Sequence, residues 1–234
     1  MDNFDWRKTI KINLFALKVA GLWPKEYEVY KPNLYLLYAV ASTFIILGGH
    51  NLSQVINIFY VYTDLEALTA TIFVAATNIF SIVKRYFFVK NLKTIKGLLQ
   101  TLNTDQFRPK NRRQMELVEL SVKGWKKAYV YCIIALATNL TLWLSVPVLN
   151  GWVKFHRLPF EAWYPFNTKV SPNYELVYLY QFVCIWYMAL SNMNVDTLIY
   201  AFMMFIGSQC DILMDDLKNL NVGSFNEELL RCIQ

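Results

Sequence analysis

The sequence predicts an all-α fold, a polytopic transmembrane helical bundle whose N-terminus lies in the cytoplasm. Hydrophobic residues make up 56% of the 234 residues and charged residues only 17%, against roughly 25% charged in soluble proteins. The charges are clustered and leave long uncharged stretches between them. A soluble domain needs charge over its whole surface, so these stretches indicate that lipid is the solvent.

The first two predicted spans cover residues 32–63 and 64–84. No Asp, Glu, Lys or Arg occurs from Pro32 to Thr63, and a crossing needs only about 20 residues, so this helix is tilted or projects from the bilayer. Its second half holds the polar His50, Asn51, Gln54 and Asn57, which favours contact with other helices or water. Asp64 is the expected N-cap of the second span.

The third and fourth predicted spans cover residues 128–150 and 174–205. Pro147 lies near the end of the third span, where its missing N–H is expected to kink or terminate the helix. Helical character in the fourth span continues to about Cys210, which is too long for one crossing. We therefore expect the end of this helix to emerge into the cytoplasm.

The positions of Lys and Arg predict the orientation. Six precede the first span, none lies between the first two, twelve follow from Lys84 to Lys127, and three lie between the last two. Cytoplasmic loops carry the excess of Lys and Arg. This predicts a cytoplasmic amphipathic segment (1–31), a cytoplasmic helical loop (85–127), an extracellular loop (151–173) and the start of a second cytoplasmic loop (206–234). A G-protein-coupled receptor would need the opposite orientation.

The sequence shows no catalytic or metal-binding motif. The sequence contains no nucleophile, phosphate-binding or zinc-hydrolase motif, and its two histidines and four cysteines form no metal-binding pattern. We therefore expect no catalytic residue, cofactor or metal. Lys and Arg lie between apolar runs rather than in one basic patch. This distribution argues against a protein that binds nucleic acid. Asn51 begins a glycosylation sequon inside the long first helix, so its use stays open.

Three predicted spans each carry a face of aromatic, thioether, amide or hydroxyl side chains at helical spacing. Such faces suit a pocket for a small, mostly apolar ligand, although ordinary helix packing also uses small and hydroxyl residues. The candidate ligand-binding residues are Phe73, Thr77 and Phe80 on the second span, Thr138, Leu142 and Ser145 on the third, and Ile185, Met188 and Asn192 on the fourth.

Several short motifs carry a family resemblance. They are G-L-W-P at residues 21–24, L-P-F-E-A-W-Y-P-F at residues 158–166, the pair Tyr180-Gln181 after Pro172, and N-V-D-T-L at residues 194–198. In this order, and with an N-terminus predicted inside, the sequence resembles the insect odorant receptors over essentially its whole length.

That resemblance implies a seven-helix subunit of inverted topology in the plasma membrane of a sensory-neuron dendrite. Such subunits assemble with a shared co-receptor into tetrameric cation channels gated by odorants. The odorant binds in the outer half of the bundle, partly between helices two, three and four, and the last helix lines the pore. Four spans of the expected seven are present, so the resemblance also implies an incomplete chain without the pore helix. A complete four-span scaffold or accessory protein and a related gustatory receptor are the alternatives.

Overall fold

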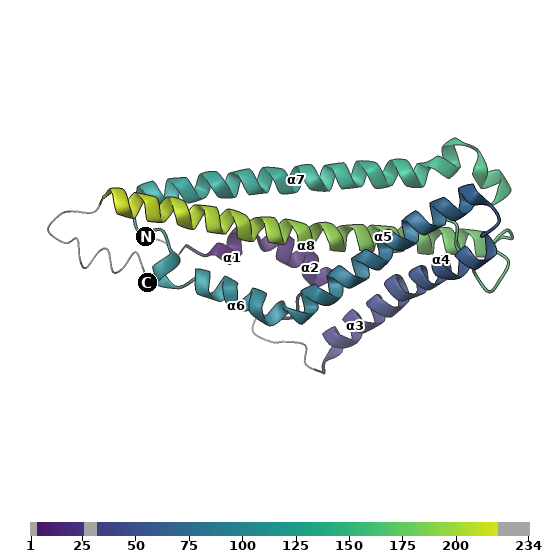
Figure 1. The fold of residues 1–234 in the computed structure, drawn as a ribbon, viewed down its shortest axis with the longest axis horizontal. Coiled ribbons are helices and arrows are strands. Elements are labelled where there is room, and N and C mark those ends of the chain that lie inside the picture. Colours follow the sequence, from purple (N-terminus) through teal and green to yellow (C-terminus); the bar gives the residue numbers. More distant parts are fainter. Residues whose placement is uncertain (1–3, 26–31, 220–234) are drawn as a thin grey trace. The chain divides into compact units, whose positions relative to one another are not determined.

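All secondary structure in the described part of the chain is helical. A computed structural model describes residues 4–25 and 32–219 (Figure 1). A six-residue π-helix, Thr43–Gly48, joins two of the α-helices. The α-helices are α1 (Trp6–Thr9), α2 (Lys11–Val19), α3 (Leu34–Ser42), α4 (Gly49–Tyr60), α5 (Leu65–Lys90), α6 (Leu92–Leu102), α7 (Arg112–Leu149) and α8 (Asn173–Lys218).

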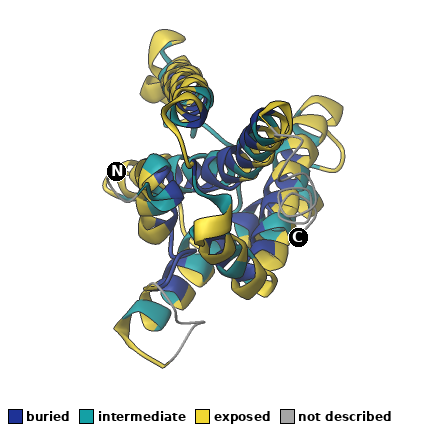
Figure 2. Cartoon of the chain, turned by 90° about the vertical axis from the view of Figure 1, so that its left-hand side faces the viewer, coloured by how far each residue is buried: buried dark blue, intermediate teal, exposed yellow. Residues whose placement is uncertain are grey.

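Four helical stretches are long and apolar enough to cross a membrane: Leu34–Tyr60, Leu65–Lys90, Arg112–Leu149 and Asn173–Lys218. The predicted all-α fold with four spans is thereby confirmed, whereas the cytoplasmic side of the N-terminus stays a prediction. Large apolar side chains remain exposed along these helices, as they do where lipid rather than water is the solvent. Figure 2 shows buried and exposed residues on different sides of the same helices.

Local signals explain several helix ends. Asn33 accepts the Leu36 N–H at 2.9 Å at the start of α3, and Asp64 accepts the Glu66 N–H at 3.1 Å at the start of α5. Both side chains supply the acceptor that the first turn of a helix lacks. Pro147 lies inside α7, which ends two residues later at Leu149.

Three helices extend beyond the apolar stretches that predicted them. α5 continues to Lys90, α7 already begins at Arg112, and α8 continues to Lys218. Together with α6, the first two of these extensions make the segment 85–127 largely helical. Lys, Arg and Glu are good helix formers, so the backbone helix does not end where the apolar residues end.

The chain divides into two compact units, and α7 and α8 contribute to both. The first unit comprises residues 1–13, 94–131 and 196–234. Its fully buried Trp6 donates its indole N–H to the Phe107 carbonyl at 3.2 Å, and its ring packs edge-on against Phe205 with centroids 5.0 Å apart. These contacts fix the N-terminal segment within its unit.

The second unit comprises residues 14–93 and 132–195. It contains α3, α4, α5, most of α2 and the adjoining parts of α7 and α8. All nine candidate ligand-binding residues of the sequence belong to this unit.

Candidate ligand-binding site

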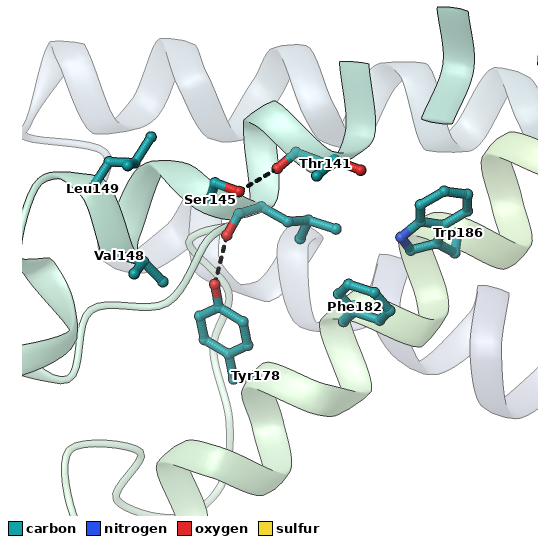
Figure 3. Close-up of a pocket in the computed structure, with 8 residues that line it drawn as sticks. Thr141, Ser145, Val148, Leu149, Tyr178, Phe182 and Trp186 are labelled. Carbon is teal, nitrogen blue, oxygen red and sulfur yellow. Dashed lines mark hydrogen bonds between the residues drawn. The ribbon is translucent and has the colours of Figure 1, made fainter. Parts of the chain in front are cut away.

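A cavity of about 390 Å³ opens between α7 and α8 in the second unit (Figure 3). This volume lies at the lower end of the range typical of small-molecule pockets. Aliphatic and aromatic side chains provide most of the lining, with two hydroxyls from α7 and one from α8. The lining residues are Thr141, Leu144, Ser145, Val148, Leu149, Tyr178, Phe182 and Trp186.

The hydroxyl groups that line the cavity already donate hydrogen bonds within the protein. Thr141 and Ser145 donate to the main-chain carbonyls four residues earlier, at 2.7 and 2.6 Å. Tyr178 donates to the Leu144 carbonyl at 2.7 Å, as Figure 3 shows. The buried indole N–H of Trp186 has no hydrogen-bond partner within the described residues. The cavity wall is therefore mainly apolar, and the hydrogens of its hydroxyl groups are not free to bind a ligand.

The loop between α7 and α8 is held against this unit by Gln181. The fully buried Gln181 side chain accepts the Phe160 N–H at 3.1 Å and donates to the Phe160 carbonyl at 2.8 Å. Its amide nitrogen also lies 3.3 Å from the Tyr164 hydroxyl. The Phe160 ring stacks on Trp143 of α7 with centroids 5.8 Å apart. These bonds give the L-P-F-E-A-W-Y-P-F motif a physical role, because its backbone and rings dock onto two helices.

The second half of the same motif contacts α4. The Trp163 N–H donates to the Ser53 carbonyl at 3.0 Å, and its indole stacks on Tyr60 with centroids 6.0 Å apart. The neighbouring Tyr164 lies in the loop outside the helices, and burial raises the pKa of its phenol. This tyrosine therefore stays neutral and able to hydrogen-bond at physiological pH.

The polar residues of the long first span lie inside the unit. His50 and Gln54 are buried, with a ring nitrogen and the amide nitrogen 3.2 Å apart. Asn78 of α5 donates to the Gln54 side-chain oxygen at 2.7 Å. Nearby, Tyr180 of α8 donates to the Ile45 carbonyl of the π-helical segment at 2.7 Å. This polar cluster links the first span to α5, and the π-helix provides a carbonyl to α8.

A buried arginine holds the main chain just before the G-L-W-P motif. Arg85, predicted at the start of a cytoplasmic loop, lies buried on α5. Its guanidinium donates to the Ala20 carbonyl at 2.6 Å and to the Tyr187 hydroxyl at 3.0 Å. Gly21 follows with φ +72°, a conformation that favours glycine. The sequence signal for Arg85 was its helical spacing from Asn78 and Ser81, the buried polar residues of the same face.

The comparisons with known proteins agree with this helical architecture. The family model described as 7tm Odorant receptor matches residues 64–234. The chain belongs to the 7tm odorant receptor family. The predicted resemblance to this family is confirmed, and with it the assignment to multi-pass membrane proteins.

Two curated odorant receptors match this receptor chain. Odorant receptor Or1 of Anopheles gambiae is 28% identical over 221 residues, which cover 94% of this chain and 52% of the relative. Odorant receptor 83a of Drosophila melanogaster is 31% identical over 103 residues, covering 44% and 21% respectively. The receptor chain therefore spans about half the length of Or1.

Two solved structures share the fold. The olfactory receptor OR5 of Machilis hrabei in complex with eugenol superposes with a TM-score of 0.79, at 20% identity over 97% of this chain and 61% of that one. A second OR5 structure gives a TM-score of 0.73 with the same identity and coverage.

The receptor fold distributes the nine predicted ligand residues over different environments. Ser145 lines the cavity between α7 and α8. Asn192 is half-buried and its amide donates to the Ser81 hydroxyl. Ile185 and Met188 are buried in the packing of α8. The structure thus brings one of the nine to the cavity wall and places these three others within the helix packing.

The other five candidates lie on exposed faces. Phe73 and Phe80 are 71% and 74% exposed, and Leu142 is 60% exposed. Thr138 is also exposed, as is Thr77, which donates its hydroxyl to the Phe73 carbonyl at 2.8 Å. Phe73 also lines a shallow hollow along the first turns of α5. These residues are not brought together with the α7–α8 cavity.

Sequence reasoning missed most of the cavity wall. Tyr178, Phe182 and Trp186 repeat every four residues on α8, which places them on one face. An aromatic series at this spacing was the available signal. Ordinary packing gives the same pattern, so the sequence alone could not separate the two.

Proposed function

We propose that this chain supplies the odorant-binding part of a receptor that gates a cation channel, and that the odorant occupies the cavity between α7 and α8. The observation that carries the proposal is an apolar cavity of small-molecule size in a member of the odorant receptor family. The related OR5 of Machilis hrabei was solved with eugenol, a small aromatic volatile. The proposed ligand is accordingly small, volatile and mostly apolar.

The affinity would come mainly from burial of the ligand. Removing apolar surface from water contributes roughly 25 cal/mol per Å², and Phe182 and Trp186 provide flat apolar surfaces at the wall. Gating would follow if the ligand binds the open arrangement of the receptor more tightly than the closed one.

The orientation and partners form the second part of the proposal. The N-terminus lies in the cytoplasm because the Lys and Arg excess falls on that side. The loop at residues 151–173 then faces the outside, with the cavity in the outer half of the bundle. The receptor acts in the plasma membrane of a sensory dendrite, in a tetrameric assembly with the shared co-receptor.

Ligand binding to the purified chain tests the site. The chain in lipid nanodiscs is titrated with eugenol and with a panel of volatile ketones, esters and phenols, and tryptophan fluorescence is recorded. We expect saturable binding of at least one compound. Ser145→Phe, which fills the cavity, should abolish that binding, because Ser145 lies on the wall.

Thr138→Phe is the matched control. This residue lies on the same helix, is exposed and does not line the cavity, so binding should persist. Retained affinity in Ser145→Phe together with loss in Thr138→Phe would place the ligand on the other face of α7. No binding across the panel would overturn the proposed function.

A further inference from the structure

We infer that an exposed stripe on the second half of α8 is a contact surface for a second copy of this chain, and that the two α8 helices pair there parallel and in register. The inference goes beyond the proposed function, because it concerns residues of the first unit and not the cavity. The exposed stripe consists of Ile199, Met203, Ile206, Cys210, Leu213 and Leu217.

The spacing of the six residues is the first observation. They follow one another at alternating intervals of four and three residues, which places them in a single line along the helix. Apolar residues at this alternation form the a and d positions through which helices pack in a coiled coil. The five apolar residues are 40–66% exposed, and Cys210 is exposed as well. The exposed stripe therefore has the pattern of a helix contact, and the described part of the chain leaves it largely open.

A second stripe on the same helix already packs within the unit. Its residues also follow at intervals of three and four and are no more than 4% exposed: Leu198, Ala201, Phe205, Ser208, Ile212 and Asp215. This buried stripe provides the packing of α8 in its own unit. The apolar side chains of the exposed stripe are not needed for that packing, so a different contact must account for them.

Water, and not lipid, surrounds the helices at the level of the exposed stripe. Trp125 of α7 donates its indole N–H to the Thr197 carbonyl at 3.1 Å, and Gln114 of α7 donates to the Asp216 carboxylate at 2.6 Å. This part of α7 therefore accompanies α8 along the stripe. Its surface carries the exposed ion pairs Arg112–Glu116 and Lys123–Glu119. Charged side chains avoid hydrocarbon, and an apolar stripe in water marks a protein contact.

The geometry of insertion favours a second copy as the occupant. Copies in one membrane share one orientation, because the same loop charges direct each of them. Their α8 helices then run parallel, and the spans hold equal residues at equal depth. Each a or d layer of one copy therefore meets the same layer of the other, as in a parallel coiled coil.

The positions beside the exposed stripe permit this approach. Charges at such flanking positions decide which helices pair. The flanking residues are Tyr200, Phe202, Gly207, Gln209, Met214 and Asp216. Asp216 is the one charged residue among the six, and its carboxylate pairs with Lys110 at 3.0 Å. Two copies can thus come together without repulsion between like charges.

The native Cys210 allows a direct test by cross-linking. Cys132 and Cys232 are first replaced by serine, and the remaining Cys184 is buried. A disulfide needs two Cα atoms within about 7 Å, which parallel pairing in register provides at residue 210. Oxidation of the chain in lipid vesicles with copper phenanthroline should give a covalent dimer. The matched control is Glu119→Cys combined with Cys210→Ser, which moves the single exposed thiol to the charged face of α7. It should cross-link at least roughly 10-fold more slowly.

A substitution in the middle of the exposed stripe tests the pairing itself. Ile206→Asp would bury a carboxylate between the two helices, so energy transfer between fluorescently tagged copies should need a roughly 100-fold higher protein-to-lipid ratio. Ile206→Leu should associate as the wild type does. Leu120→Asp is the matched control, because Leu120 is similarly exposed but lies on α7 outside the stripe, and its association should not change.

Each outcome decides for or against the inference. Cross-linking through Cys210 that is no faster than through residue 119 overturns it, as does equal association of the wild type and Ile206→Asp. Quenching of a fluorophore on Cys210 by nitroxide-labelled lipids would show that the stripe lies on the membrane and would also overturn it. If Ile206→Asp fails to fold, cross-linking of the unaltered stripe decides. Ligand binding by the cavity is measured separately, so the proposed function stands or fails independently.

Discussion

Replacement of Gln181 by methionine should release the loop that carries the L-P-F-E-A-W-Y-P-F motif. Methionine has nearly the length and shape of glutamine without its polar atoms. The wild-type amide accepts the Phe160 N–H at 3.1 Å and donates to the Phe160 carbonyl at 2.8 Å. The variant leaves both main-chain groups without these partners, while the apolar packing of the side chain is largely preserved.

The expected loss of loop stability follows from the Phe160 N–H and carbonyl, which lose their hydrogen-bond partners. An unsatisfied buried polar group costs roughly 1–3 kcal/mol. Phe160 is only half-buried, so its main chain recovers part of this cost by moving towards water. We expect the docked loop to lose about 2 kcal/mol, which corresponds to a roughly 30-fold increase in the population of its open state.

Hydrogen exchange with mass spectrometry measures this opening directly. Peptides that cover residues 158–166 should exchange about 30-fold faster in Gln181→Met than in the wild type, while peptides from α6 stay unchanged. Gln100→Met is the matched control, because Gln100 is exposed on α6. An exchange rate in the loop within about threefold of wild type would show that the Gln181 amide does not hold the loop. Equal acceleration by the control would show a nonspecific effect.

Three further perturbations test other contacts. Gly49→Ala should weaken the packing of α4 on α8, since its Cβ would lie 2.7 Å from the Tyr180 hydroxyl. Gly48→Ala is the control, because its nearest atom is 3.7 Å away and both variants gain the same preference of alanine for a helix. We expect Gly49→Ala to melt at a lower temperature than Gly48→Ala, and equal melting temperatures would contradict this. Arg85→Lys should speed proteolysis at the end of α2, because one ammonium cannot reproduce the forked contacts of a guanidinium; an unchanged cleavage rate would contradict this. Burial raises the pKa of Tyr164, so the neutral phenol favours the docked loop, and loop exchange corrected for intrinsic rate should increase only above about pH 10; an increase between pH 6 and pH 8 would exclude this tyrosine as the cause.

The number and order of the long helices could be predicted because a membrane crossing imposes a simple length rule. Uncharged runs located all four spans, and Asp64 marked the start of α5. The helix extents could not be obtained in this way. α8 runs to Lys218 through several acidic residues, because main-chain hydrogen bonding in a helix does not depend on apolar side chains.

The candidate site was less predictable because lipid is as apolar as a protein interior. In water, the apolar face of a helix marks the core, whereas in a bilayer it can equally face the lipid. On α5 the apolar and aromatic face with Phe73 and Phe80 is exposed, and the polar face with Asn78 and Arg85 is buried. The polar residues within apolar runs were therefore the better guide to the interior.

Photoaffinity labelling locates the bound ligand directly. A small aromatic ketone that bears a diazirine is bound to the wild-type chain in nanodiscs, activated by light, and the labelled residues are mapped by mass spectrometry. We expect labels confined to residues 141–149 of α7 and 178–186 of α8, the two segments that line the cavity, and we expect excess unlabelled ketone to suppress them. Competable labels on the exposed α5 face between Phe73 and Phe80, with none on the cavity wall, would contradict it.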